Sequence, residues 1–215
     1  MRKPLVSVIV PTYRRELFFI ERAINSILNQ TYRNVEVIVI DDNSSESIYR
    51  KRNEEYFKKL KDKNIIYIKN EKNLGGALAR NVGIKYSHGE YITFLDDDDE
   101  YLPCKIEHQV EFMIKYKFDM SFSNLIIKNE NGRIVDYRKY NIKDFSMLNL
   151  LKYHLMHHIT GTPTYMYKKK VLEELEGFPD VKVGQEFILM LNTIKLGYKI
   201  GYLNADDVIS YSHKG

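Results

Sequence analysis

Short apolar segments alternate with helical patterns through the first half of the chain. Four of these segments are rich in β-branched and aromatic residues and are bounded by Pro, Asp, Asn or Gly, a composition that predicts strands. They cover residues 5–10, 35–40, 65–68 and 91–95. Apolar residues recur at helical spacing from Ile20 to Leu28, which predicts an amphipathic helix. A second helix is expected over 44–61, and a third closes over 81–86.

This alternation predicts an α/β fold with a mainly parallel central sheet flanked by helices, because parallel neighbours need crossover connections. In such sheets, ligands bind at the carboxyl ends of the strands. The residues directly after three of the strands are therefore candidates for a binding site. They are 11–14, 41–44 and 96–99.

The second half of the chain is less regular. Helices are expected over 106–114, 148–156 and 185–196, and the basic run at 168–170 is expected to cap the start of another. Strands are expected over 119–127, 198–203 and 208–211, with a hairpin turn at 129–132. No internal repeat, low-complexity tract or linker interrupts the sequence, so residues 1–215 are interpreted as one domain.

Composition narrows the class of protein. Hydrophobic residues make up 44% of the chain, enough for a folded core, and no apolar stretch reaches the roughly 20 residues that span a bilayer. The net charge of +4 is compatible with an anionic ligand or a membrane surface. The aromatic residues do not interleave with basic ones as in nucleic-acid stacking platforms, so nucleic acid is not an expected partner. The single cysteine, Cys104, excludes an internal disulfide framework and is consistent with a cytoplasmic location.

Four consecutive aspartates, at 96–99, follow the fourth strand. Like charges so close together repel, so this run is costly unless something neutralises it. A calcium loop is disfavoured because the twelve-residue spacing with a central glycine is missing. A solvated acidic turn and a magnesium or manganese site with positions open to substrate phosphates both remain compatible with the spacing.

Five motifs occur in a fixed order along the chain. They are SVIVPTY from residue 7, SILNQTY from residue 26, VIDDNS from residue 39, NLGGALARNVG from residue 73 and GEYITFLDDDD from residue 89. This series resembles the family-2 inverting glycosyltransferases. The resemblance implies the A-type nucleotide-sugar transferase fold and a role in bacterial surface-polysaccharide assembly. It also implies a nucleotide-sugar-binding half at 1–103 and an acceptor and catalytic half at 104–215.

The resemblance implies a donor site built from residues of four motifs. They are Pro11, Thr12, Tyr13, Asp41, Asp42, Arg80, Asp96 and Asp97. The first three would cradle the base and ribose, Asp42 would pair with the uracil edge with Asp41 supporting it, and Arg80 would lie beside the nucleotide. Asp96 and Asp97 would face the ribose and a Mn²⁺ or Mg²⁺ cofactor. The family usually has Asn after the Tyr of the first loop, whereas this chain has Arg14 and Arg15.

The same resemblance implies two metal ligands and a catalytic base. Asp98 occupies the position of the chief metal ligand, and His213, after the last strand, would complete the metal shell. Inverting transfer needs a base that takes the proton from the acceptor hydroxyl. Glu186 stands where the family has an acidic residue at the start of a helix, although a glutamate there could simply complement the helix dipole. His154, His157 and His158 are expected to be partly exposed.

The implied function is metal-dependent inverting transfer of a sugar from a nucleoside-diphosphate sugar, a uridine one, to an acceptor hydroxyl. The acceptor would be a saccharide or a lipid-linked saccharide, with peripheral association at the inner membrane face. A sugar-1-phosphate nucleotidyltransferase is an alternative, but it would carry a glycine-rich loop after the first strand, which is absent here. A second alternative is a nucleotide-sugar-binding module without catalysis, suggested by the unusual Gln185-Glu186 pair.

Overall fold

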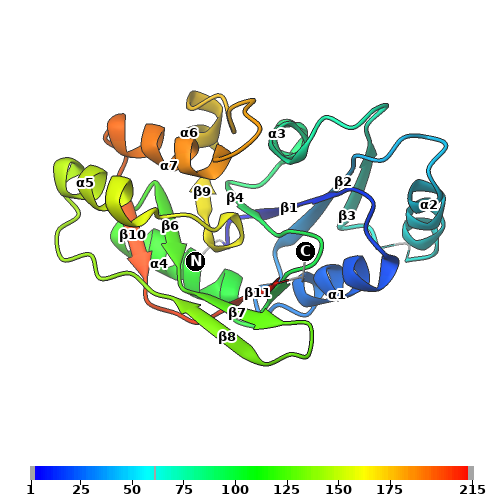
Figure 1. Cartoon of the computed structure of the whole chain (residues 1–215), viewed down its shortest axis with the longest axis horizontal. Helices are drawn as coiled ribbons and strands as arrows, with labels where there is room; N and C mark the ends of the chain where they lie inside the picture. Colours follow the sequence, from blue (N-terminus) through cyan, green and yellow to red (C-terminus); the bar gives the residue numbers. More distant parts are fainter. Residues whose placement is uncertain (1–2, 61, 213–215) are drawn as a thin grey trace.

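The structure, a computed structural model of the chain, describes residues 3–60 and 62–212. Its centre is a seven-stranded sheet in the order β10-β6-β9-β4-β1-β2-β3 (Figure 1). Four of these strands come from the first half: β1 (Val6–Thr12), β2 (Val35–Asp41), β3 (Ile65–Lys69) and β4 (Tyr91–Phe94). They pair in parallel, β4 with β1, β1 with β2 and β2 with β3. The predicted mainly parallel sheet is confirmed.

Successive residues of a strand point to opposite faces of a sheet, so a strand of apolar residues needs cover on both faces. Helices provide that cover here. Val8 and Val10 of β1 pack with Ile24 of α1 (Leu17–Leu28), while Ile9 packs with Ala79 of α3 (Gly76–Tyr86). In Figure 1, α3 lies above the sheet and α1 below it. The remaining first-half helix, α2 (Ile48–Leu60), lies at the β3 end.

The close packing of α3 on β1 depends on Gly83. A methyl group added at Gly83 would lie 2.4 Å from Cγ2 of Ile9, a distance that real side chains do not tolerate. The helix begins after Gly75, whose φ of 82° lies in the left-handed region that favours glycine. Together these glycines bring the first turns of α3 to the carboxyl end of the sheet.

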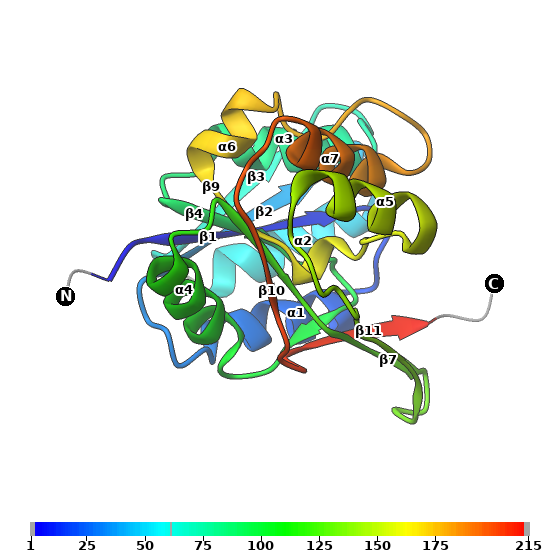
Figure 2. The ribbon, with the colours of Figure 1, turned by 90° about the vertical axis from the view of Figure 1, so that its left-hand side faces the viewer.

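The second half contributes the remaining strands of the large sheet and three of the four strands of the small one. Its helices are α4 (Lys105–Tyr116), α5 (Met147–His157), α6 (Lys169–Glu174) and α7 (Gln185–Lys195), with a 3₁₀ turn at Thr162–Thr164. Its strands are β6 (Met120–Ser123), β7 (Leu125–Asn129), β8 (Ile134–Arg138), β9 (Met166–Lys168), β10 (Ile200–Leu203) and β11 (Val208–Ser212). A four-stranded sheet has the order β5-β11-β7-β8, with β5 at Glu100–Tyr101. Figure 2 shows α5 and β7 on the near side of the molecule.

The prediction of a single strand over 119–127 is wrong. The chain turns at Asn124, so β6 joins the large sheet and β7 the small one. The buried Asn124 side chain holds this turn, since its Nδ2 donates to Asn204 Oδ1 at 2.8 Å and to Asp206 Oδ1 at 2.7 Å. β9 was not expected either, and it inserts antiparallel between β4 and β6. The hairpin turn before β8 and the helix start at 168–170 are confirmed.

Candidate functional site

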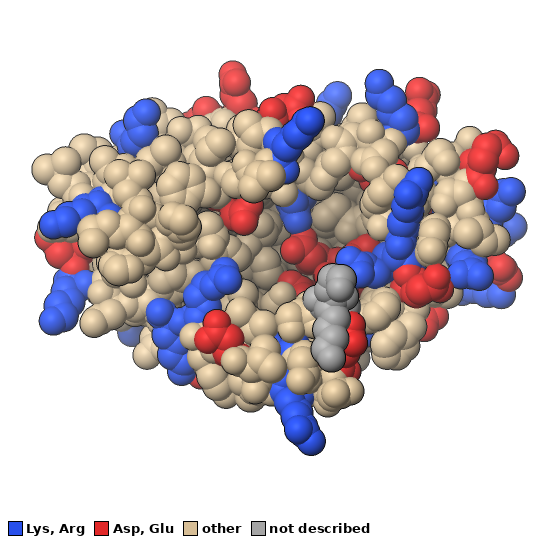
Figure 3. Space-filling view, in the orientation of Figure 1, with Lys and Arg blue, Asp and Glu red and all other residues tan. Residues whose placement is uncertain are grey.

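A cavity of 440 Å³ opens at the carboxyl ends of β1, β2 and β4, beside the first turns of α3. Its wall combines the three polar segments that follow these strands with the glycine-rich start of α3. It is lined by Pro11, Thr12, Tyr13, Arg15, Asp42, Asn73, Gly75, Gly76, Ala79, Arg80, Asp96, Asp97 and Asp98. Figure 3 shows acidic side chains in a hollow near the middle of this face. The structure thus brings together all the predicted donor residues except Asp41.

The four aspartates at 96–99 have different partners, which explains how the run is tolerated. Asp96 forms an ion pair with Arg80, and Arg15 lies between the next two, with Nε 2.8 Å from Asp97 and Nη2 2.7 Å from Asp98. Asp99 points away from the cavity and accepts a hydrogen bond from the backbone N–H of Tyr211 at 3.2 Å. Two arginines therefore supply the compensating charge within the described residues.

Burial changes the ionisation of two of these aspartates. It raises the pKa of Asp97 to about 6, although the nearby Arg15 guanidinium opposes that shift. Burial also raises the pKa of Asp99 well above its usual range, and the negative charges of Asp96 and Asp98 add to the effect. A cation bound at the cavity side of the run would favour the ionised forms.

The Arg80 guanidinium is buried and only partly satisfied. One of its Nη atoms contacts Asp96, and its Cζ atom lies 5.5 Å from the centre of the Phe178 ring. Nε and Nη1 have no hydrogen-bond partner among the described residues. Buried polar groups are rarely left unpaired, and guanidinium groups suit phosphate oxygens. Arg80 is therefore positioned for an anionic ligand in the cavity.

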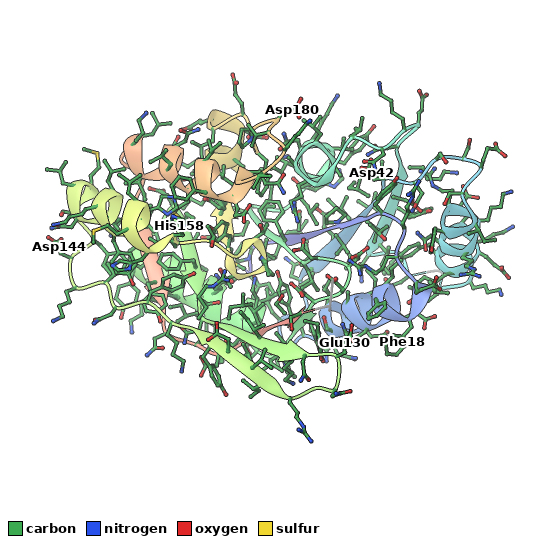
Figure 4. The ribbon with its side chains drawn as sticks, in the orientation of Figure 1. Phe18, Asp42, Glu130, Asp144, His158 and Asp180 are labelled. Carbon is green, nitrogen blue, oxygen red and sulfur yellow. The ribbon has the colours of Figure 1, made fainter. Side chains whose placement is uncertain are left out.

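The two aspartates after β2 are both held by protein groups. Asp42, which lies beside α3 in Figure 4, accepts hydrogen bonds from the backbone N–H groups of Leu74 and Gly75 at 2.9–3.0 Å and from Asn70 Nδ2 at 2.8 Å. It thus fixes the loop that leads into α3 while forming part of the cavity wall.

Asp41 is fully buried below that wall. It pairs with Arg50 at 3.2 Å and accepts hydrogen bonds from Asn53 Nδ2 at 2.9 Å and Tyr67 OH at 2.5 Å. Burial, together with the neighbouring Asp41 carboxylate, raises the pKa of Tyr67. The position of Asp41 suits support of its neighbour and gives it no surface toward a ligand in the cavity.

The first loop contains a cavity residue that the sequence interpretation did not assign. Arg15 was noted only as part of a departure from the family pattern, yet it contacts Asp97, 82 residues away in sequence, and the adjacent Asp98. Its neighbour Arg14 adopts the left-handed region with φ of 50°, a conformation in which asparagine is less strained. The sequence signal that could have identified Arg15 is a basic residue shortly after the first strand in a chain that also has a run of carboxylates.

Glu186 lies in the first turn of α7 and is half-buried outside the cavity wall. The start of α7 approaches the start of α3. A methyl group added at Gly76 would lie only 3.7 Å from Gln185 Nε2. Glu186 is therefore close to the cavity but not part of its lining. A second carboxylate, Asp180, lies in the loop before α7 (Figure 4).

His154 does not share the expected exposure of its two neighbours. It is fully buried, its Nδ1 accepts a hydrogen bond from Ile159 N at 3.0 Å, and its Nε2 lies 2.9 Å from Phe187 O. Burial lowers the pKa of His154, so the neutral ring with its proton on Nε2 fits both contacts. The expectation of partial exposure was wrong for His154, whereas His157 and His158 are exposed.

The residues present suit a divalent metal in their chemistry. Carboxylate oxygens of Asp96 and Asp98 lie at the cavity wall, and hard oxygen ligands are the ones that Mg²⁺ and Mn²⁺ prefer. Among residues 3–60 and 62–212, no group of three or more His, Cys, Asp or Glu side chains forms a ready metal-binding cluster. A complete shell would therefore need ligand or water oxygens. His213, the other predicted metal ligand, lies outside the described residues.

Comparison with known proteins is consistent with this geometry. A family model described as Glycosyl transferase family 2 matches residues 7–176. The uncharacterized glycosyltransferase MJ1057 of Methanocaldococcus jannaschii is 34% identical over 202 residues, which cover 93% of this chain and 68% of MJ1057. TuaG of Bacillus subtilis, a putative teichuronic acid biosynthesis glycosyltransferase, is 30% identical over 196 residues, covering 91% of this chain and 74% of TuaG.

A further relative and a solved structure are also similar. WfaP of Escherichia coli, a UDP-Glc:alpha-D-GlcNAc-diphosphoundecaprenol beta-1,3-glucosyltransferase, is 39% identical over 126 residues, covering 59% of this chain but 48% of WfaP. The crystal structure of S. aureus TarS 1–349 with UDP-GlcNAc matches with a TM-score of 0.77 and 25% identity, over 98% of this chain and 59% of that chain. The expected A-type transferase fold is thereby confirmed. The chain belongs to glycosyltransferase family 2.

Proposed function

We propose that this protein transfers a sugar from a uridine-diphosphate sugar to an acceptor hydroxyl, with inversion and with the help of Mn²⁺ or Mg²⁺. The observation that carries the proposal is the buried Arg80 guanidinium, with two unpaired nitrogens, beside a carboxylate run at the carboxyl ends of the strands. Cationic and metal-binding groups side by side are what a diphosphate needs. UDP-sugars also appear in the names of WfaP and of the TarS complex.

Each part of the cavity has a role in this proposal. Pro11 and Tyr13 contact the nucleoside, with Asp42 at the base end, and Arg80 faces the diphosphate. Asp96 and Asp98 would hold the divalent ion, which when bound neutralises charge on the departing diphosphate. Arg15 would exchange its carboxylate contacts for a phosphate oxygen when the donor binds.

Glu186 is proposed as the general base. Its place in the first turn of α7 supports this role, because the preceding residue, Gln185, approaches Gly76 of the cavity wall. The base would take the proton of the acceptor hydroxyl as that oxygen forms its bond to the anomeric carbon and the bond to the diphosphate breaks. The proton thus ends on Glu186 and the negative charge on the nucleotide.

The acceptor is proposed to be a lipid-linked saccharide. Two relatives from E. coli, WfaP and WfgD, are named for a GlcNAc-diphosphoundecaprenol acceptor. The matched region covers 48% of each of these relatives, so the acceptor rests on part of their length.

Labelled UDP-glucose and UDP-N-acetylglucosamine, each incubated with the protein, Mn²⁺ and lipid extracted from bacterial membranes, test this function. The proposal predicts label in the lipid phase with release of UDP, and loss of that label in Glu186→Gln. Release of pyrophosphate from UTP and a sugar 1-phosphate would instead identify a nucleotidyltransferase. Donor binding without transfer or slow donor hydrolysis would identify an inactive binding module.

A further inference from the structure

One end of the molecule exposes an unusual number of large apolar side chains. On α5, Leu148 is 72%, Met156 63%, Leu155 53% and Met147 48% exposed, and Phe145, just before the helix, is 38% exposed. The helix forms the left-hand end of the molecule in Figure 1 and faces the viewer in Figure 2. A group of exposed apolar side chains on one element commonly marks a contact surface.

Only some of these residues share one side of the helix, because Phe145 and Met147 line a cavity together with the buried Leu150. Leu148, Lys152 and Leu155 are spaced by four and three residues, so they lie on one side of α5. The opposite side is occupied, because Leu150 and His154 are buried and His154 stacks on Phe187 of α7 with ring centres 4.2 Å apart. The apolar stripe is therefore not needed to hold α5 in the fold.

Positive charge accompanies the stripe. A cavity of 400 Å³ beside it is lined by Lys143 and Lys152, together with polar and apolar residues that include Asn149, Tyr153 and Met156. The one acidic residue in that lining is Asp144, which Figure 4 places at the turn before α5. Its carboxylate is engaged by Ser146 N at 2.8 Å, by Ser146 Oγ at 3.1 Å and by Asn149, so it is used in fixing the start of α5. Both lysines are exposed, and neither forms a salt bridge within residues 3–60 and 62–212.

We propose that Lys143, Leu148, Lys152, Leu155 and Met156, here called the α5 face, dock this protein on the surface of an anionic phospholipid bilayer. Apolar side chains would enter the headgroup boundary while the lysines meet lipid phosphates, the mode of interfacial amphipathic helices. None of the helices within the described part of the chain is long and apolar enough to cross a bilayer, so contact through these helices would be peripheral.

Charge favours an anionic bilayer over a second copy of the chain as the partner of the α5 face. In a two-fold dimer the same patch meets itself, which would bring Lys143 and Lys152 toward the lysines of the other copy. Like charges in such an interface are unfavourable, whereas an anionic bilayer complements them.

The location of the α5 face suits a lipid-linked acceptor. This step of the inference rests on the proposed function, which includes such an acceptor. α5 packs on α7 through His154 and Phe187, and Phe187 follows Glu186 directly. Docking through the α5 face would hold the start of α7, and with it the proposed base, near a lipid-linked saccharide at the membrane surface.

Co-sedimentation with vesicles tests the inference without donor or acceptor. The protein is mixed with vesicles of phosphatidylcholine alone or of phosphatidylcholine with phosphatidylglycerol. Binding is expected only to the anionic vesicles and should fall with salt. Each lysine near an anionic surface contributes about fivefold to binding, so Lys143→Ala/Lys152→Ala should weaken it roughly 25-fold. Lys51→Ala/Lys58→Ala, which removes the same charge from α2, should bind like the wild type.

A second pair of variants tests the apolar part. Leu148→Glu should weaken vesicle binding by about tenfold or more, since burying a leucine is worth at least that factor. Ile48→Glu, at the first residue of α2 and 55% exposed, is the matched control and should have little effect. Equal losses in both members of either pair would overturn the assignment to α5. So would absence of vesicle binding, or sedimentation velocity showing a dimer that Leu148→Glu dissociates. UDP binding by the same variants, unchanged in every case, keeps this outcome separate from the proposed transferase function.

Discussion

The guanidinium of Arg15 lies 2.7 Å from a carboxylate oxygen of Asp98, the residue proposed as the chief metal ligand. It also lies 2.8 Å from Asp97, so one side chain bridges two carboxylates at the cavity wall. A positive charge is therefore already paired with the proposed metal ligand. Metal binding and the Arg15 contact should compete.

This competition predicts that removing the arginine tightens metal binding. Arg15→Gln should bind Mn²⁺ alone more tightly by about 1 kcal/mol or more, at least roughly fivefold, because charged hydrogen bonds to two carboxylates no longer have to break. Electron paramagnetic resonance of free Mn²⁺ measures this directly. The adjacent and exposed Arg14→Gln removes the same charge and is the control. If both variants bind Mn²⁺ as the wild type does, the Arg15 contact does not compete with metal binding.

Substitution of the proposed base should affect turnover and leave donor binding intact. A positioned base contributes about 10²- to 10⁴-fold in rate, so Glu186→Gln should slow transfer by that factor with nearly unchanged UDP affinity. Glu186→Asp should recover part of the rate. Asp180→Asn, in the loop before α7, should transfer sugar at close to the wild-type rate. The opposite pattern, in which Asp180→Asn is the slow variant, would move the base to Asp180.

Lys105 provides a prediction about stability and pH. Its side chain is buried, contacts Thr93 Oγ1 and lies 4.1 Å from the centre of the Tyr101 ring. Burial lowers the pKa of Lys105 well below its usual range, and the charge of Asp207 only partly offsets this. The folded state therefore binds fewer protons than the unfolded state, in which the pKa is about 10.4.

The free energy of unfolding should consequently rise with pH from the lowered folded-state pKa up to about 10.4. Lys105→Met lacks this group, so its stability relative to the wild type should be greatest at low pH and should decline as pH rises. Urea unfolding of both proteins across neutral and alkaline pH gives the comparison. A stability difference that does not change with pH would contradict a neutral, buried Lys105.

Much of the fold was predictable from the sequence because its first half is locally consistent. The strands at 35–41 and 65–69 are β-branched runs that end at polar residues, and the structure places their bounds within a residue of the expectation. The turn at Asn124 was not predictable, because it depends on Asn204 and Asp206, some 80 residues away. The three residues of β9 are too few to show a period.

The functional site also has a part that the sequence predicted and a part that it did not. Its carboxylates were found because they lie directly after strands, where the topology gathers ligand-binding groups, and Arg80 was found because its Ala-Arg-Asn segment resembles that of the family. The contact of Arg15 with Asp97 and Asp98 depends on how two distant loops approach, so the basic residue after the first strand indicates a nearby cation but not which carboxylates it pairs with. Likewise, nothing in the sequence around Asp42 indicates that its carboxylate holds the loop at Leu74 and Gly75.

Titration calorimetry of UDP in the presence of Mn²⁺ measures whether the cavity beside Arg80 binds the diphosphate of a uridine nucleotide. The wild type should bind UDP more tightly than ADP or GDP. Arg80→Met, shown to be folded by circular dichroism, should bind UDP about 1.5–3 kcal/mol more weakly, roughly 10- to 150-fold. Arg33→Met, which removes an exposed arginine elsewhere, should match the wild type. The account is contradicted if the wild type shows no preference for UDP, or if Arg80→Met binds it with unchanged affinity.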